Sequence, residues 1–158
     1  MTIREFEPGD ETAFRQLNEE WILRYFAMEP TDEELLSDPR RTILDRGGRI
    51  FFAVREGTPI GCCALQAMHP GEYEVAKMAV TQSAQRGGVG RSLLQTVIAA
   101  ARAIGARRLT LETNRKLATA IHLYESLGFQ HVAPRATPYA RAGVFMEMEL
   151  LDSSGRSD

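Results

Sequence analysis

A glycine-rich turn at residues 85–90 (QRGGVG) lies between a segment with strand character and a strongly amphipathic segment. Residues 72–80 (EYEVAKMAV) favour a strand, whereas Val89, Leu93 and Val97 fall on one face of a helix. A strand that turns directly into a helix with one apolar face buries that face against a sheet. The chain is therefore expected to combine a sheet with helices that pack on it.

The remaining segments extend this arrangement. Strands are expected at 2–7, 49–55, 60–67, 72–80, 107–113, 129–132 and 143–150, and helices at 11–28, from Thr31, from Pro39, at 89–104 and at 116–127. Hairpins followed by strand–helix–strand units predict a single-domain α+β fold with a mixed, mostly antiparallel sheet of about seven strands flanked by helices. We expect one domain over residues 1–151 and a disordered tail at 152–158 (DSSGRSD), which is small and polar.

Local signals predict where the first three helices begin. Asp10 is expected to cap the first helix, and Thr31 with Glu34 matches a capping box for the second. Pro39 fits the first turn of a third helix. Each start is thus predicted at a residue that suits a helix N-terminus.

Charge and cysteine content exclude several classes of protein. The chain has 19 Lys and Arg against 21 Asp and Glu, a formal net charge of -2, which argues against nucleic acid or a membrane surface as its partner. It has neither an apolar run long enough to span a membrane nor a recognisable signal peptide, so a cytoplasmic protein is expected. Cys62 and Cys63 are adjacent and would point to opposite faces of a strand, which excludes a disulfide framework. No His or Cys spacing suggests a metal site.

The glycine-rich turn is also a candidate anion site. Helix N-termini present unpaired amides, and Gly87, Gly88 and Gly90 lack a Cβ, so a diphosphate can approach the main chain closely. Arg86 and Arg91 either add charge at the rim or simply face solvent. A tight turn without a ligand explains these glycines equally well. The pattern is not a P-loop, which needs a Lys before its Ser or Thr, and its spacing differs from the dinucleotide-binding fingerprint.

Four short motifs together resemble one family. A Gln-x-x-Gly-x-Gly pattern at 85–90 follows Lys-Met-Ala-Val at 77–80, and Leu-Glu-Thr-Asn at 111–114 precedes Ala-Ile-His-Leu-Tyr-Glu-Ser-Leu-Gly-Phe at 120–129. In combination they resemble the GCN5-related N-acetyltransferases, the GNAT superfamily. The resemblance is strong over residues 49–150 and rests before them only on the order of the elements.

The resemblance implies a V-shaped sheet in which the strands at 72–80 and 107–113 part, with coenzyme A entering the gap. Main-chain groups of residues 78–80 would pair with the pantetheine arm, and the loop that begins at Gln85 would hold the diphosphate. The implied cofactor-binding residues are Met78, Ala79, Val80, Gln85, Arg86, Gly87, Gly88, Val89, Gly90, Arg91, Ser92, Asn114, Ala120 and Tyr124. Many relatives carry Asn at the position of Leu117, and Asn114 is the nearest Asn here.

The implied reaction is attack of an amine on the thioester of acetyl-CoA, without a metal. Tyr124 matches the family's proton donor to the departing thiolate, although its position also suits an apolar stripe. Glu112 matches the base of the ribosomal-protein acetyltransferase branch, Glu74 is a second candidate for the base, and ordered water alone is a third. Each glutamate equally suits solvent or a pair with Lys77 or Arg108.

The acceptor is expected to be an amine of a small molecule or a peptide. A run of acidic residues would favour a cationic amine; its members are Glu19, Glu20, Glu29, Asp32, Glu33 and Glu34. Trp21, Tyr25 and Phe26 are interpreted as core beneath the sheet. Dimers are common in the family, and the last strand, 143–150, suits pairing with a second copy of the chain.

Two other functions stay open on the sequence. A non-catalytic acyl-CoA binding or sensing domain needs the loop at 85–91 but neither Tyr124 nor a base. A nucleotide-phosphate binder needs only the loop, and it would prefer ATP to coenzyme A.

Overall fold

The computed structural model describes residues 1–150. Its elements are β1 (Thr2–Glu5), α1 (Glu11–Tyr25), α2 (Pro30–Ser37), α3 (Pro39–Thr42), η1 (Leu44–Arg46), β2 (Arg49–Arg55), β3 (Thr58–His69), β4 (Glu72–Val80), η2 (Gln82–Ala84), α4 (Val89–Ala103), β5 (Arg108–Thr113), α5 (Ala118–Ser126), β6 (Gln130–Val132) and β7 (Val144–Glu149). The predicted order of strands and helices and the α+β fold are confirmed. The tail predicted at 152–158 lies outside the described residues.

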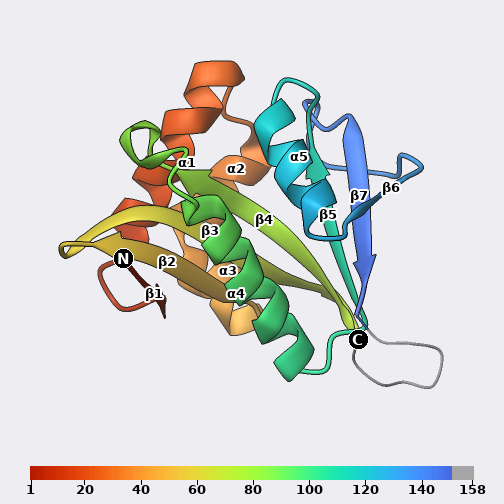
Figure 1. The fold of residues 1–158 in the computed structure, drawn as a ribbon, viewed down its shortest axis with the longest axis horizontal. Helices are drawn as coiled ribbons and strands as arrows, with labels where there is room; N and C mark the ends of the chain where they lie inside the picture. Colours follow the sequence, from red (N-terminus) through yellow and green to blue (C-terminus); the bar gives the residue numbers. More distant parts are fainter. Residues whose placement is uncertain (151–158) are drawn as a thin grey trace.

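The seven strands form one sheet in the order β1-β2-β3-β4-β5-β7-β6, in which β4 and β5 alone are parallel. Helices α4 and α5 cover one face and α1 and α2 the other (Figure 1). Cys62 belongs to the core on the α1 side and Cys63 to the core on the α4 side, as the alternation of a strand requires. None of the helices within residues 1–150 is long and apolar enough to cross a membrane.

The strands β4 and β5 pair over a short length only. Glu72–Glu74 pairs with Arg108–Thr110, and beyond these residues the two strands separate (Figure 1). On its other edge β4 stays paired with β3 as far as Val80, with two register shifts, one of them opposite Cys63. Lys77 lies in the shift opposite Cys63 with a φ of +52°, a left-handed conformation that is uncommon for a residue other than glycine. One edge of β4 is therefore left facing an opening in the sheet.

Three local predictions need correction. The α2 helix begins at Pro30 and not after Thr31, because the main-chain N–H of Glu29 donates to Asp32 Oδ2 at 2.9 Å and makes Glu29 the cap residue. Asp10 occupies the cap position of α1, yet its carboxylate accepts from Arg4 rather than from the helix. The α1 helix ends at Tyr25, three residues earlier than expected.

The last strand is paired on both sides. Its partner on one edge is β5, and β6 covers Phe145, Met146 and Glu147 on the other edge. Over these residues β7 offers no free edge to a second copy of the chain. Dimerisation stays a prediction.

Candidate active site

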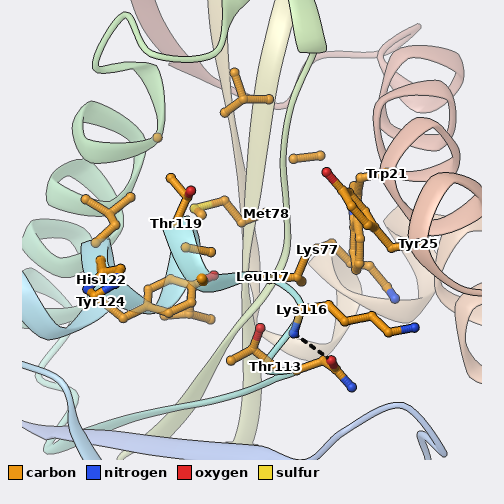
Figure 2. A pocket seen from close by; sticks show the side chains of 18 of the residues that line it. Trp21, Tyr25, Lys77, Met78, Thr113, Lys116, Leu117, Thr119, His122 and Tyr124 are labelled. Atoms are coloured by element: carbon orange, nitrogen blue, oxygen red, sulfur yellow. Dashed lines mark hydrogen bonds between the residues drawn. The ribbon is translucent and has the colours of Figure 1, made fainter.

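The opening between β4 and β5 holds a pocket of about 850 Å³. It is lined by α1, β4, the glycine-rich turn, β5, α5 and the segment before β7. Figure 2 shows Tyr124 and His122 on one side, Trp21 and Tyr25 on the other, and Met78 and Lys77 between them. One end of the pocket thus lies at the start of α4, and the other end lies at α1.

The start of α4, residues 88–91, is a candidate anion-binding site and is here called the anion cradle. Gly88 caps the helix with a φ of +79°, which glycine adopts without strain. The amides of Val89, Gly90 and Arg91 form the first turn and have no partner within the helix. A Cβ on Gly90 would lie 3.3 Å from Leu123 Cδ2, so a side chain there would narrow the pocket. A phosphoryl group can therefore reach amides at the positive end of the helix dipole.

Two hydrogen bonds fix the cradle to its neighbours. Gln85 Nε2 donates to the carbonyl oxygen of Val80 at 3.1 Å, which ties the turn to the end of β4. Arg91 Nη2 donates to Ser126 Oγ at 3.0 Å, which ties α4 to α5. These two contacts fix the positions of β4, α4 and α5 relative to one another at this end of the pocket.

Most of the residues predicted for the site line this one pocket. They are Glu74, Met78, Ala79, Val80, Gln85, Arg86, Gly88, Val89, Gly90, Arg91, Glu112, Asn114, Ala120 and Tyr124. Gly87 and Ser92 are not in the lining, and the amide of Ser92 donates to the carbonyl of Gly88. Asn114 uses its side chain within the protein: it donates to the carbonyl of Arg141 at 2.7 Å and accepts from the amide of Lys116 at 2.9 Å.

Tyr124 projects from α5 into the middle of the pocket (Figure 2). It is buried, and its ring packs edge-on against Phe129 with centroids 5.9 Å apart. Burial, and then the neighbouring Cys63 thiol, raise the pKa of the phenol above its ordinary value. The hydroxyl therefore keeps its proton at neutral pH and can act as a donor.

Glu74 and Glu112 form a carboxyl pair where β4 and β5 part. Glu74 pairs in register with Thr110, two residues before Glu112, so both glutamates face the same side of the sheet. Burial, and then the charge and hydrogen bond of Glu112, raise the pKa of Glu74 to about 7. One buried oxygen of Glu112, Oε1, has no hydrogen-bond partner among the described residues. Such a pair holds one proton in mild acid and is ready to take a proton above neutrality.

A buried ionic cluster beside the carboxyl pair was missed by the sequence analysis. Asp32 accepts hydrogen bonds from Lys77 and, at 2.6 and 2.7 Å, from Arg141. Lys77 also donates to Tyr139 Oη at 3.1 Å. Although burial acts to raise it, the bonds from Arg141 and Lys77 lower the pKa of Asp32 to about 2. A lysine in the middle of an apolar strand was the one signal in the sequence that such a cluster exists.

The aromatic residues of α1 lie differently from the prediction. Trp21, Tyr25 and Phe26 line the pocket, and Tyr25 is 39% exposed, so they are not simply core beneath the sheet.

Most of the nearby acidic residues accept hydrogen bonds from other groups of the protein. Glu20 accepts from Thr81 and Gln82, Glu29 from Ala140, Asp32 from Lys77 and Arg141, and both Glu19 and Glu33 from Arg15. The predicted acidic rim is therefore mostly paired.

Comparison with known proteins identifies the family and the fold. A sequence profile of the Acetyltransferase (GNAT) family matches residues 13–129. The chain belongs to the GNAT family. A GNAT acetyltransferase from Staphylococcus aureus Mu50 superposes with a TM-score of 0.86 at 18% identity, covering 94% of this chain and 98% of that one.

Two further proteins are similar to this GNAT chain. An IAA acetyltransferase from Azospirillum brasilense is 40% identical over 105 residues, which cover 65% of this chain and 68% of that protein. An acetyltransferase from Salmonella typhimurium, solved with acetyl-CoA, has a TM-score of 0.77 at 22% identity and covers 96% of this chain and 95% of that one. The chain spans 27% and 63% of the length of two other curated relatives. Within residues 1–150 no group of three or more His, Cys, Asp or Glu is placed to hold a metal ion.

Proposed function

We propose that this GNAT protein is an acetyl-CoA-dependent N-acetyltransferase whose acceptor is a primary amine of a small molecule or a peptide. The observation that carries the proposal is one pocket whose lining includes the start of α4, Tyr124 and the Glu74–Glu112 pair. Thioester aminolysis needs a site for the diphosphate, a proton donor for sulfur and a proton acceptor for nitrogen. The lining offers one candidate group for each of these tasks.

Coenzyme A fits the first part of the pocket by its chemistry. Its diphosphate suits the amides of Val89, Gly90 and Arg91, and its pantetheine amides suit the unpaired edge of β4 at Met78 and Ala79. The absence of a Cβ at Gly90 leaves the width that the arm needs. Backbone groups thus do most of the binding, and the acetyl group is directed toward Tyr124.

The chemical step forms a C–N bond and breaks a C–S bond. An alkylammonium of ordinary pKa loses its proton at pH 7 at a cost of about 4.6 kcal/mol, which a nearby base offsets in part. Glu74 or Glu112 accepts that proton, directly or through water, and the free nitrogen attacks the thioester carbon. Tyr124 donates its proton to the departing thiolate, and the second proton that the nitrogen loses after attack returns to the Tyr124 phenolate, directly or through water. The products are the N-acetylated amine and free coenzyme A, with one proton left on the glutamate.

The test is release of free thiol from acetyl-CoA over a panel of aromatic monoamines, polyamines, aminoglycosides, amino acids and peptides. Tyr124→Phe is expected to lower kcat by about 100-fold with an unchanged KM for acetyl-CoA, because only the proton donor is lost. Tyr73→Phe is the matched control, since Tyr73 lies on β4 outside the pocket lining.

Two results would contradict the proposal. Calorimetric binding of coenzyme A without turnover of any amine would favour the acyl-CoA binding or sensing domain. A larger thermal shift with ATP than with coenzyme A would favour a nucleotide-phosphate binder.

A further inference from the structure

The end of the pocket at α1, here called the acceptor end, has an aromatic wall. Trp21, Tyr25 and Phe26 come from the last turn of α1 and the residue after it, and Tyr139 comes from the segment before β7. Trp21 is held in place because its Nε1 donates to Asn18 Oδ1 at 3.1 Å, and its ring meets Phe26 edge-on at 6.3 Å. These rings present a large, ordered apolar surface next to the carboxyl pair.

The carboxylates of the acceptor end are satisfied by the protein itself. Asp32 is fully buried between Lys77 and Arg141. Glu29 accepts from the amide of Ala140 at 2.8 Å and lies 3.4 Å from Arg141. The remaining acids, Glu74 and Glu112, are the groups to which the reacting nitrogen loses its proton. No carboxylate in the lining of this end is left to receive a second ammonium group.

The cations of the acceptor end already occupy the aromatic faces. The guanidinium of Arg141 lies over Trp21, Phe26 and Tyr139, with its carbon 5.5, 5.9 and 4.5 Å from the ring centroids. Lys116 Nζ lies 5.4 Å from the centroid of Phe26 and makes no ion pair among the described residues. A second positive charge on an acceptor would meet like charge here and would not gain the cation–π contacts that the rings otherwise offer.

From this arrangement we infer that the acceptor is a primary monoamine carried on an aromatic or similarly bulky apolar body, and that polyamines are excluded. The inference rests on the proposed function and names its substrate class. The apolar body packs against Trp21 and Tyr25 while its amine reaches the Glu74–Glu112 pair. Lys116 is the residue that discriminates by charge, because its ammonium has no carboxylate to neutralise it.

The experiment compares kcat/KM for tryptamine and for spermidine in the full chain. Tryptamine is expected to exceed spermidine by at least about tenfold. Lys116→Glu is expected to raise the spermidine-to-tryptamine ratio of kcat/KM by about tenfold, because an attractive charge replaces a repulsive one. Tyr25→Ala is expected to raise KM for tryptamine by about tenfold without changing KM for acetyl-CoA.

Leu23→Ala is the matched control, since Leu23 lies on the same helix, is 60% exposed and does not line the pocket. Tyr25 is partly exposed, so its replacement is expected to leave the fold intact, and circular dichroism of each variant checks this. A preference for spermidine, or a ratio that Lys116→Glu leaves unchanged, overturns the inference while leaving the proposed function in place. Absence of thiol release with every amine overturns the proposed function itself, and the inference with it.

Discussion

The Glu74–Glu112 pair is expected to control how kcat depends on pH. The pKa of Glu74 is raised from an ordinary 4.5 to about 7, so ionising it in the folded protein costs an extra 3 kcal/mol or so, roughly 1.4 kcal/mol per unit. Because the ionised pair is the base, kcat is expected to rise as the pH passes through about 7. Below this pH the pair keeps its proton and the amine cannot give one up.

Replacing one glutamate at a time separates their roles. Glu112→Gln removes the charge that raises the pKa of Glu74 but leaves its burial, so the rise in kcat is expected to move to lower pH. If Glu74 is the base, this variant keeps most of its maximal kcat. If Glu112 is the base, Glu112→Gln lowers kcat by about 100-fold or more, whereas Glu74→Gln stays active and loses the step near neutrality.

The assay is kcat from about pH 5.5 to 9 with both substrates saturating and one fixed amine. The titration of the amine is then common to all three proteins and cancels in the comparison. The reasoning is refuted if both variants keep more than half of the wild-type kcat and the same pH profile, because ordered water would then suffice as the base.

Three other perturbations follow from the structure. Gly88→Asp is expected to raise KM for acetyl-CoA at least about tenfold, because it puts a negative charge where the diphosphate is expected. Gly57→Asp controls for backbone strain, because Gly57 has a similar φ of +77° and does not line the pocket. Asp32→Asn is expected to lower the free energy of unfolding by about 3–5 kcal/mol, because the buried Lys77 and the partly buried Arg141 lose their shared carboxylate. The substitution of an exposed residue, Asp45→Asn, is expected to be neutral, and urea denaturation measures both. The raised pKa of Glu74 means that the wild type loses stability as the pH rises from about 4.5 to about 7. The stability of Glu74→Gln relative to the wild type is therefore expected to increase over the same range, by up to about 3 kcal/mol.

The sheet and its order could be predicted because the information is local. The spacing of apolar residues predicts strands such as 49–55 and the amphipathic helix at 89–103. The glycines at 88 and 90 are needed for a left-handed cap and a narrow approach, and both needs act within a few residues. Three candidate site residues, Glu74, Glu112 and Tyr124, came from the family resemblance, and the fold places all three in one pocket.

The acceptor end could not be predicted, because its contacts join distant parts of the chain. Asp32 and Arg141 are 109 residues apart, and nothing near either one indicates the other. Trp21 and Phe26 were predicted as core because they are large and apolar. The spacing of apolar residues on a helix does not distinguish residues of the core from residues that line a pocket. The cap at Glu29 was missed because Thr31 fits the usual motif better, while Asp32 supplies the bond.

The short pairing between β4 and β5 leaves the sheet as two leaves that share three positions, Glu72–Glu74 with Arg108–Thr110. The leaf that ends in β4 carries Lys77, and the segment leading into β7 carries Arg141; both bind Asp32 of α2, past the point where the strands part. Movement of the two leaves relative to each other is thus resisted at two places: at the paired residues of β4 and β5, and at the ion pairs that Asp32 makes with Lys77 and Arg141.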